Sequence, residues 1–115
     1  MILQKIIETL QAGLGCYVGV QSPETGDRFV LIDQTGSQRR NHLNTVTVAI
    51  QSYGPTLADA LSINASVEQV MMNRLLADDL IAAVKFNTDY NFTNPETKEY
   101  RWQAVYDITY YHQEV

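Results

Sequence analysis

Cysteine is almost absent from this sequence, and long apolar runs are absent altogether. A single cysteine, Cys16, excludes an intrachain disulfide and is typical of proteins from a reducing compartment. Because Cys16 lies at the edge of an apolar segment, we interpret it as a small buried hydrophobic side chain and not as a reactive thiol. The apolar runs are far shorter than the roughly 20 residues that a membrane span requires.

The N-terminal segment has no basic leader of the kind that opens a signal peptide, and Lys5 and Glu8 interrupt its apolar residues. We therefore expect a soluble, cytosolic protein with no membrane partner. Positive charge is scarce too, since 8 Lys and Arg residues stand against 13 Asp and Glu residues, for a formal net charge of -5. A free-standing nucleic-acid-binding domain is usually basic, so the composition argues against one.

Recognisable catalytic and metal-binding motifs are missing. His42 and His112 have no further His or Cys at a metal-ligand spacing. Asp78 and Asp79 come nearest to a carboxylate pair, and we interpret them as solvated surface residues. No glycine-rich phosphate loop and no serine nucleophile elbow occurs. The sequence therefore predicts a protein that is not an enzyme, with no catalytic residue, no cofactor and no metal site.

Two helices are predicted. Apolar residues at helical spacing indicate the first over residues 2–14, which Gly13 and Gly15 end. The second follows Gly-Pro, with Thr56 as N-cap and Asp59 in the position of a capping-box acid, and ends between residues 74 and 79. Six residues of this helix are predicted to form its buried stripe: Leu57, Leu61, Val67, Val70, Met71 and Leu75.

Strands are predicted over residues 28–33 and 45–53, with a further short strand possible over 16–22. The polar segment 34–44 reads either as a loop or as an exposed hairpin arm, and 80–86 reads as a helical turn before an extended stretch. A hairpin then follows, with its turn at 94–99 and a return strand at 100–111. The length suits one domain, over residues 1–115.

The return strand alternates between a bulky apolar side and a mostly polar side. Its even-numbered residues from Trp102 to Tyr110 predict the side on which a helix packs. These elements together predict an α+β fold, with a mostly antiparallel sheet of about four strands and two helices packed on one face.

Arg39, Arg40 and His42 form the one basic cluster of an acidic chain. Two interpretations stay open. The cluster is either a solvated loop tip or a contact arm that meets an acidic neighbour or passing DNA. Two arginines give only weak, salt-sensitive attraction to a duplex, which symmetry around a ring would multiply.

The order of these elements resembles that of the tail terminator, or tail-completion, proteins of long-tailed bacteriophages. The likeness covers nearly the whole chain, from the glycine-ended first helix to the aromatic strand "YRWQAVYDITYY". Its most specific part is residues 45–61, where the strand "TVTVAIQSYGPT" leads into the capped helix "LADAL". No short signature carries it, so no family contact residue transfers onto this sequence one by one.

The resemblance implies a structural viral protein of the virion tail or neck that assembles in the cytoplasm of the bacterial host. Six copies would form a hexameric ring on the tail tube, stop its elongation and provide the surface for head joining. The implied partners are further copies of the chain, the tail tube protein, a head connector or completion protein, and DNA in the ring's lumen.

A ring needs two different complementary patches on each subunit. Outward apolar positions predict one of them, at Tyr53, Val105 and Tyr111. Two other functions remain open: a head-completion or connector-adaptor protein, and a small α+β enzyme or ligand-binding domain.

Overall fold

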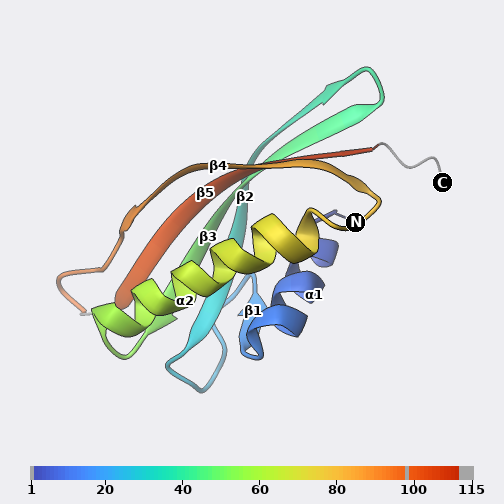
Figure 1. Ribbon diagram of the computed structural model, residues 1–115. Helices are drawn as coiled ribbons and strands as arrows, with labels where there is room; N and C mark the ends of the chain where they lie inside the picture. The colour runs from blue at the N-terminus through green and yellow to red at the C-terminus, as the bar shows by residue number, and fades with distance from the viewer. Residues whose placement is uncertain (1, 98, 112–115) are drawn as a thin grey trace.

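The computed structural model describes residues 2–97 and 99–111, which form two long helices, a π-helical turn and five strands (Figure 1). In chain order these are α1 (Ile2–Leu14), β1 (Tyr17–Gly19), β2 (Phe29–Arg40), β3 (Leu43–Gly54), α2 (Leu57–Gln69), η1 (Val70–Leu75), β4 (Ile81–Asn91) and β5 (Tyr100–Tyr111). The expected α+β class is thus confirmed.

The sheet has the strand order β1-β2-β3-β5-β4. The four long strands pair antiparallel, whereas β1 pairs parallel with β2, from Tyr17 opposite Phe29 to Gly19 opposite Leu31. The sheet is therefore mixed and has five strands, where about four mostly antiparallel strands were expected. The difference lies in β1, whose three residues are too few for a clear alternation of side chains.

The segment that was open between a loop and a hairpin arm forms an arm. β2 and β3 each have 12 residues and are joined by Asn41 and His42 alone. Both turn residues have positive φ, 51° and 69°, as in the two-residue type I′ turn that matches the twist of a hairpin. In Figure 1 this arm projects well beyond the two helices. The molecule is accordingly elongated, 45 × 23 × 23 Å.

Both helices pack on one face of the sheet, as expected. On β5 the even-numbered residues Ala104, Tyr106 and Ile108 are fully buried, which confirms the predicted side for helix packing. α1 contributes Ile2, Ile6 and Leu10 to the same core. Gly15 ends α1 with a φ of 71°, a conformation that glycine adopts without strain.

The start of α2 is capped as predicted: the Thr56 hydroxyl accepts a hydrogen bond from the Asp59 amide at 3.1 Å. The predicted stripe is wrong at its first two positions, because Leu57 and Leu61 are 36% and 45% exposed. Ala60 and Asn64 are buried in their place, while the remaining four residues of the stripe are buried.

Contact with the end of β3 explains this phase of the helix. A Cβ atom on Gly54 would lie 2.7 Å from the Ala60 nitrogen, so the first turn of α2 lies against the strand backbone. Only a small side chain fits there, and Ala60 supplies it. After Gln69 the helix widens into the π-helix η1, which changes its phase and lets Met71 and Leu75 reach the core. The helical segment ends within the predicted range.

Candidate interaction surfaces

The tip of the hairpin arm carries all three residues of the predicted basic cluster. Arg39, Arg40 and His42 are exposed. The Arg39 Nε atom donates to the Asn44 side-chain oxygen at 3.0 Å. Within residues 2–97 and 99–111, neither arginine forms an ion pair with a carboxylate. The tip therefore presents two guanidinium groups that have no carboxylate partner among these residues.

Strand pairing brings Tyr111 close to this tip. Leu43 lies opposite Arg40 on one side and opposite Tyr111 on the other. Paired strands are about 4.8 Å apart, so the three residues form one row across the arm. Tyr111 is 52% exposed. One predicted apolar contact residue thus joins the basic cluster at the same end of the molecule.

The sheet face opposite the helices, here called the open face, is bound together by polar side chains. Thr47 donates to the Asp107 carboxylate at 2.6 Å, and Gln51 donates to Gln103 at 2.7 Å. Thr45 and Thr109 share a hydrogen bond of 3.1 Å. The Thr47 hydroxyl and then other neighbours lower the pKa of Asp107, so this carboxyl stays ionised in the folded protein. The open face is therefore an ordered polar surface.

Val105 lies in the middle of the open face, opposite Ala49 on β3 and Thr88 on β4. It is half-buried and has a neighbouring strand on each side. Val105 is apart from both ends of the sheet and does not contact the tip. The predicted apolar contact residues are therefore spread along the open face and do not form one patch.

Tyr53 lies at the end of the sheet far from the tip. Its ring stacks on Phe29 with centroids 4.5 Å apart, and its hydroxyl donates to Gln51 and accepts from Arg101, each at 3.0 Å. The Arg101 guanidinium lies 4.6 Å from the centre of the Phe92 ring. Only 7% of Tyr53 is exposed, so it supports this end of the sheet and offers little surface of its own.

A shallow hollow adjoins Tyr53. Asp27 and Glu99 line it together with Phe29, Tyr53 and Tyr100. Both carboxylates belong to exposed residues. The hollow brings together three segments that are distant in sequence, so no single local pattern of residues predicts it. A signal was present, since "SPETGD" and "NPETKE" repeat Pro-Glu-Thr and hold four of the 13 acidic residues.

Around the hollow, carboxylate groups outnumber guanidinium groups among the described residues. Arg28 lies 3.7 Å from Asp27 and 3.6 Å from Asp59, so one cation is shared between two carboxylates. Glu99 has no ion pair in the described part of the chain. With Arg101 beside Tyr53, the described charged groups around the hollow are the carboxylates of Asp27, Asp59 and Glu99 and the guanidinium groups of Arg28 and Arg101, an excess of one negative charge.

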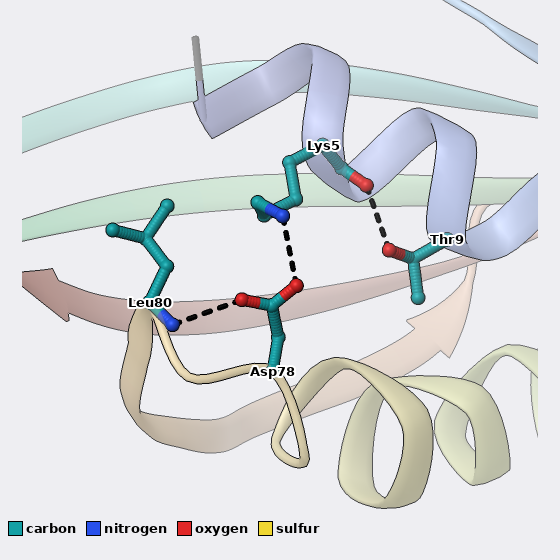
Figure 2. Close-up of polar contacts among 4 residues, drawn as sticks. All are labelled: Lys5, Thr9, Asp78 and Leu80. Carbon is teal, nitrogen blue, oxygen red and sulfur yellow. Dashed lines mark hydrogen bonds and ion pairs between the residues drawn. The ribbon is translucent and has the colours of Figure 1, made fainter.

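Asp78 is not the solvated surface residue that its pairing with Asp79 suggested. Figure 2 shows its carboxylate between Lys5 of α1 and the backbone of Leu80. The Lys5 ammonium lies 2.8 Å away, and the Leu80 amide donates to the other oxygen at 2.9 Å. These contacts lower the pKa of Asp78. Asp79 is exposed, as expected.

Four buried polar atoms on the helix-covered side have no hydrogen-bond partner within the described residues: Ser52 Oγ, Asn64 Oδ1, Trp102 Nε1 and Tyr106 Oη. Three come from neighbouring strands β3 and β5, and Asn64 reaches them from α2, where it donates to Asp89 at 2.9 Å. Burial, followed by Glu68 and Asp89, raises the pKa of Tyr106. The buried polar atoms without a hydrogen-bond partner among the described residues are therefore found on the side of the sheet that α2 covers.

The remaining predicted residues are placed as follows. Cys16 is half-buried against the core, and burial raises the pKa of its thiol, which keeps it protonated as expected. His112 lies outside the described residues. Among the residues that the structure describes, no group of three or more His, Cys, Asp or Glu side chains is arranged to hold a metal ion. No helix within the same residues has the length and apolarity needed to cross a membrane.

Both edges of the sheet have backbone N–H and C=O groups that are not paired with another strand of the described residues. β1 pairs with only the first three residues of β2, and no strand of the described chain pairs with residues 32–40 on that side. β4 forms the other edge, where register shifts interrupt its pairing with β5 at two points. Irregularities of this kind hinder unspecific pairing of edges. The two edges differ, so each suits a different partner surface.

Comparison of the sequence with models of known protein families gives no match, and comparison with curated proteins gives no significant match.

Proposed function

We propose that this chain is a bacteriophage virion assembly protein that caps the tail tube as a ring, stops its elongation and provides the surface for head joining. The observation that supports this most directly is the elongated molecule with a bare hairpin arm at one end and a different surface at the other. Cyclic rings need such heterologous contacts, in which each subunit offers two unlike patches.

The open face supplies further support. It is rigid, because hydrogen bonds join its side chains across β3 and β5. Val105 and Tyr111 add apolar surface to a face that is otherwise mostly polar. Such a mixture of polar and apolar surface is typical of non-obligate interfaces. The proposed mechanism is binding and steric capping, in which no covalent bond forms or breaks.

The test adds purified protein to a polymerising tail tube protein and measures tube lengths by electron microscopy. Capping is expected to halt growth and to leave a ring on one tube end. Val105→Lys with Tyr111→Lys is expected to abolish the rings and spare the monomer fold, because a lysine stem can cover Ala49 in place of Val105. Ser62→Lys, on the exposed side of α2, is the matched control.

In a phage, disruption of the gene is expected to give tails of uncontrolled length and free heads. Tails of normal length with unjoined heads would instead identify a head-completion or connector-adaptor protein. A stable monomer that binds a small molecule and leaves tube length unchanged would contradict both assembly functions.

A further inference from the structure

The two ends of the molecule are complementary in charge. The arm tip presents Arg39 and Arg40 without ion pairs among the described residues, whereas the hollow at the other end is lined by Asp27 and Glu99. A guanidinium group forms strong charge-assisted hydrogen bonds with carboxylates and stacks well on aromatic rings. The hollow offers both kinds of partner, because Phe29, Tyr53 and Tyr100 line it together with the acids.

The same end of the protein already holds one arginine against aromatic rings, without an ion pair among the described residues. Arg101 lies over the rings of Tyr53 and Phe92, and its guanidinium donates to the Tyr53 hydroxyl. The local chemistry therefore suits a guanidinium beside aromatic rings.

An arm cannot reach the hollow of its own chain. The tip and the hollow lie at opposite ends of β3, near Leu43 and Tyr53 respectively. At a rise of about 3.4 Å per residue the strand separates them by roughly 34 Å, far more than the length of an arginine side chain. Any contact between the two surfaces must therefore join two molecules.

We propose that the arm tip of one copy docks in the acidic hollow of a second copy, which gives a head-to-tail contact between chains. Arg40 lies on the open face, in the row of Tyr111, and Arg39 lies on the opposite face of the arm. The two arginines therefore approach the hollow from both sides of the tip. This inference rests on the proposed function, because the contact would help to close the ring. It identifies the neighbouring copy as the partner of the arm.

A second copy is a better occupant for the tip than DNA. Two arginines make few phosphate contacts, and a net charge of -5 repels a polyanion at longer range. A second copy is also acidic overall, but at its hollow the tip would meet two carboxylates and three aromatic rings at short range. The interaction is expected to weaken as salt is raised, since the groups on both sides are exposed.

The first experiment maps the contact directly. A photoreactive benzoylphenylalanine replaces His42 at the tip, and isotopically light and heavy copies are mixed at millimolar concentration and irradiated. Mass spectrometry is expected to find light-to-heavy cross-links that end at residues 27–29 or 99–100. Cross-links that end at another tip, or elsewhere, or none at all, would overturn the proposal. The same probe at Ser62 on α2 is the control.

The second experiment reverses the charges. Arg39→Glu with Arg40→Glu, and separately Asp27→Arg with Glu99→Arg, are each expected to weaken self-association about tenfold in sedimentation equilibrium at low salt. A mixture of the two variants is expected to associate again, because each reversed surface then meets its complement. Association of the mixture no stronger than that of either variant alone would contradict the contact.

These results are separable from the proposed function. Cross-links at the predicted residues without any effect on tube length would retain the contact and reject the tail-capping function. Rings on tube ends without those cross-links would retain the function and reject the contact. Binding of duplex DNA by the wild type, lost in the arm variant while self-association is unchanged, would also reject it.

Discussion

Lys5 and Asp78 form an ion pair of 2.8 Å between residues that are 73 positions apart in the sequence. The pair joins α1 to the turn between η1 and β4, where the same carboxylate also accepts the Leu80 amide. One acidic side chain thus fixes the approach of a helix and the entry to an edge strand.

Asp78→Asn is expected to lower the free energy of unfolding by about 1 kcal/mol, since it weakens a partly exposed ion pair and a backbone hydrogen bond. Urea unfolding measures this change. Asp79→Asn is the matched control, because Asp79 is its exposed neighbour and should change stability little. Equal effects of the two substitutions would contradict a specific role for Asp78.

The contribution of Asp78 is also expected to depend on pH. Its pKa is lowered in the folded protein, so the stabilisation is fully present above the unfolded value of about 3.9 and is lost as pH falls through the folded value. Wild type and Asp78→Asn should therefore converge in stability below about pH 4. A difference that persists unchanged at lower pH would speak against this linkage.

Tyr106→Phe is expected to raise the free energy of unfolding by about 1 kcal/mol, because it removes a buried hydroxyl that has no partner among the described residues. The ring keeps its edge-on contact with Phe86, whose centroid is 5.5 Å away. Tyr53→Phe is the opposite control, and is expected to lose about 1 kcal/mol with its two hydrogen bonds. Thermal unfolding of both variants would measure the contrast, and a loss of stability in Tyr106→Phe would refute the prediction.

Alkaline pH extends the same comparison. Burial raises the pKa of Tyr106, so the folded protein keeps its proton while the unfolded chain releases it above about pH 10. Stability from this group is present below that pH and declines above it. Tyr106→Phe should show a flatter decline between pH 10 and 11 by denaturant titration.

Gly54→Ala is expected to destabilise the protein by about 2 kcal/mol, because the new methyl group would meet the first turn of α2. Gly36→Ala is the control, since its nearest neighbour, Thr47, would be 4.0 Å from the added Cβ atom. Guanidinium unfolding of both variants measures the difference. Similar stabilities would mean that α2 shifts freely on β3.

His42→Gly is expected to stabilise the arm by about 1 kcal/mol, because residue 42 has a φ of 69° that glycine adopts at lower cost. Hydrogen exchange of the arm amides measures this effect locally. If the histidine side chain also contacts a neighbouring copy, the variant should be a more stable monomer that associates less strongly. An arm that exchanges faster would contradict the turn assignment.

Local signals in the sequence were sufficient for several features of the fold. The Thr56 cap depends on a hydroxyl and an amide three residues apart, and the alternation from residue 100 to 111 directly predicts which side meets the helices. Features that depend on distant contacts were missed. The phase of α2 depends on Gly54, and the acidic hollow depends on how Asp27 and Glu99 are brought together by strand pairing.

The arm illustrates an intermediate case. Residues 34–44 are polar and contain glycine, which favours a loop as much as a strand. Their extended form depends on a two-residue turn in which Asn41 and His42 both adopt left-handed conformations. The sequence lacks the Asn-Gly pair that usually predicts such a turn. The sequence shows that Arg39, Arg40 and His42 are clustered, whereas it does not determine that they project from the body of the protein.

The three residues of β1 divide one margin of the sheet into two unequal lengths. β1 covers the edge of β2 at residues 29–31, whereas no strand of the described part of the chain pairs on that side with the nine residues 32–40, a length of about 30 Å. A strand of another molecule that pairs with residues 32–40 would meet the end of β1 at Val18 and Gly19. β1 therefore limits the length and the register of such a strand. On the β2 side of the sheet, addition of a strand is thus confined to residues 32–40, which favours a defined contact over an open-ended fibre.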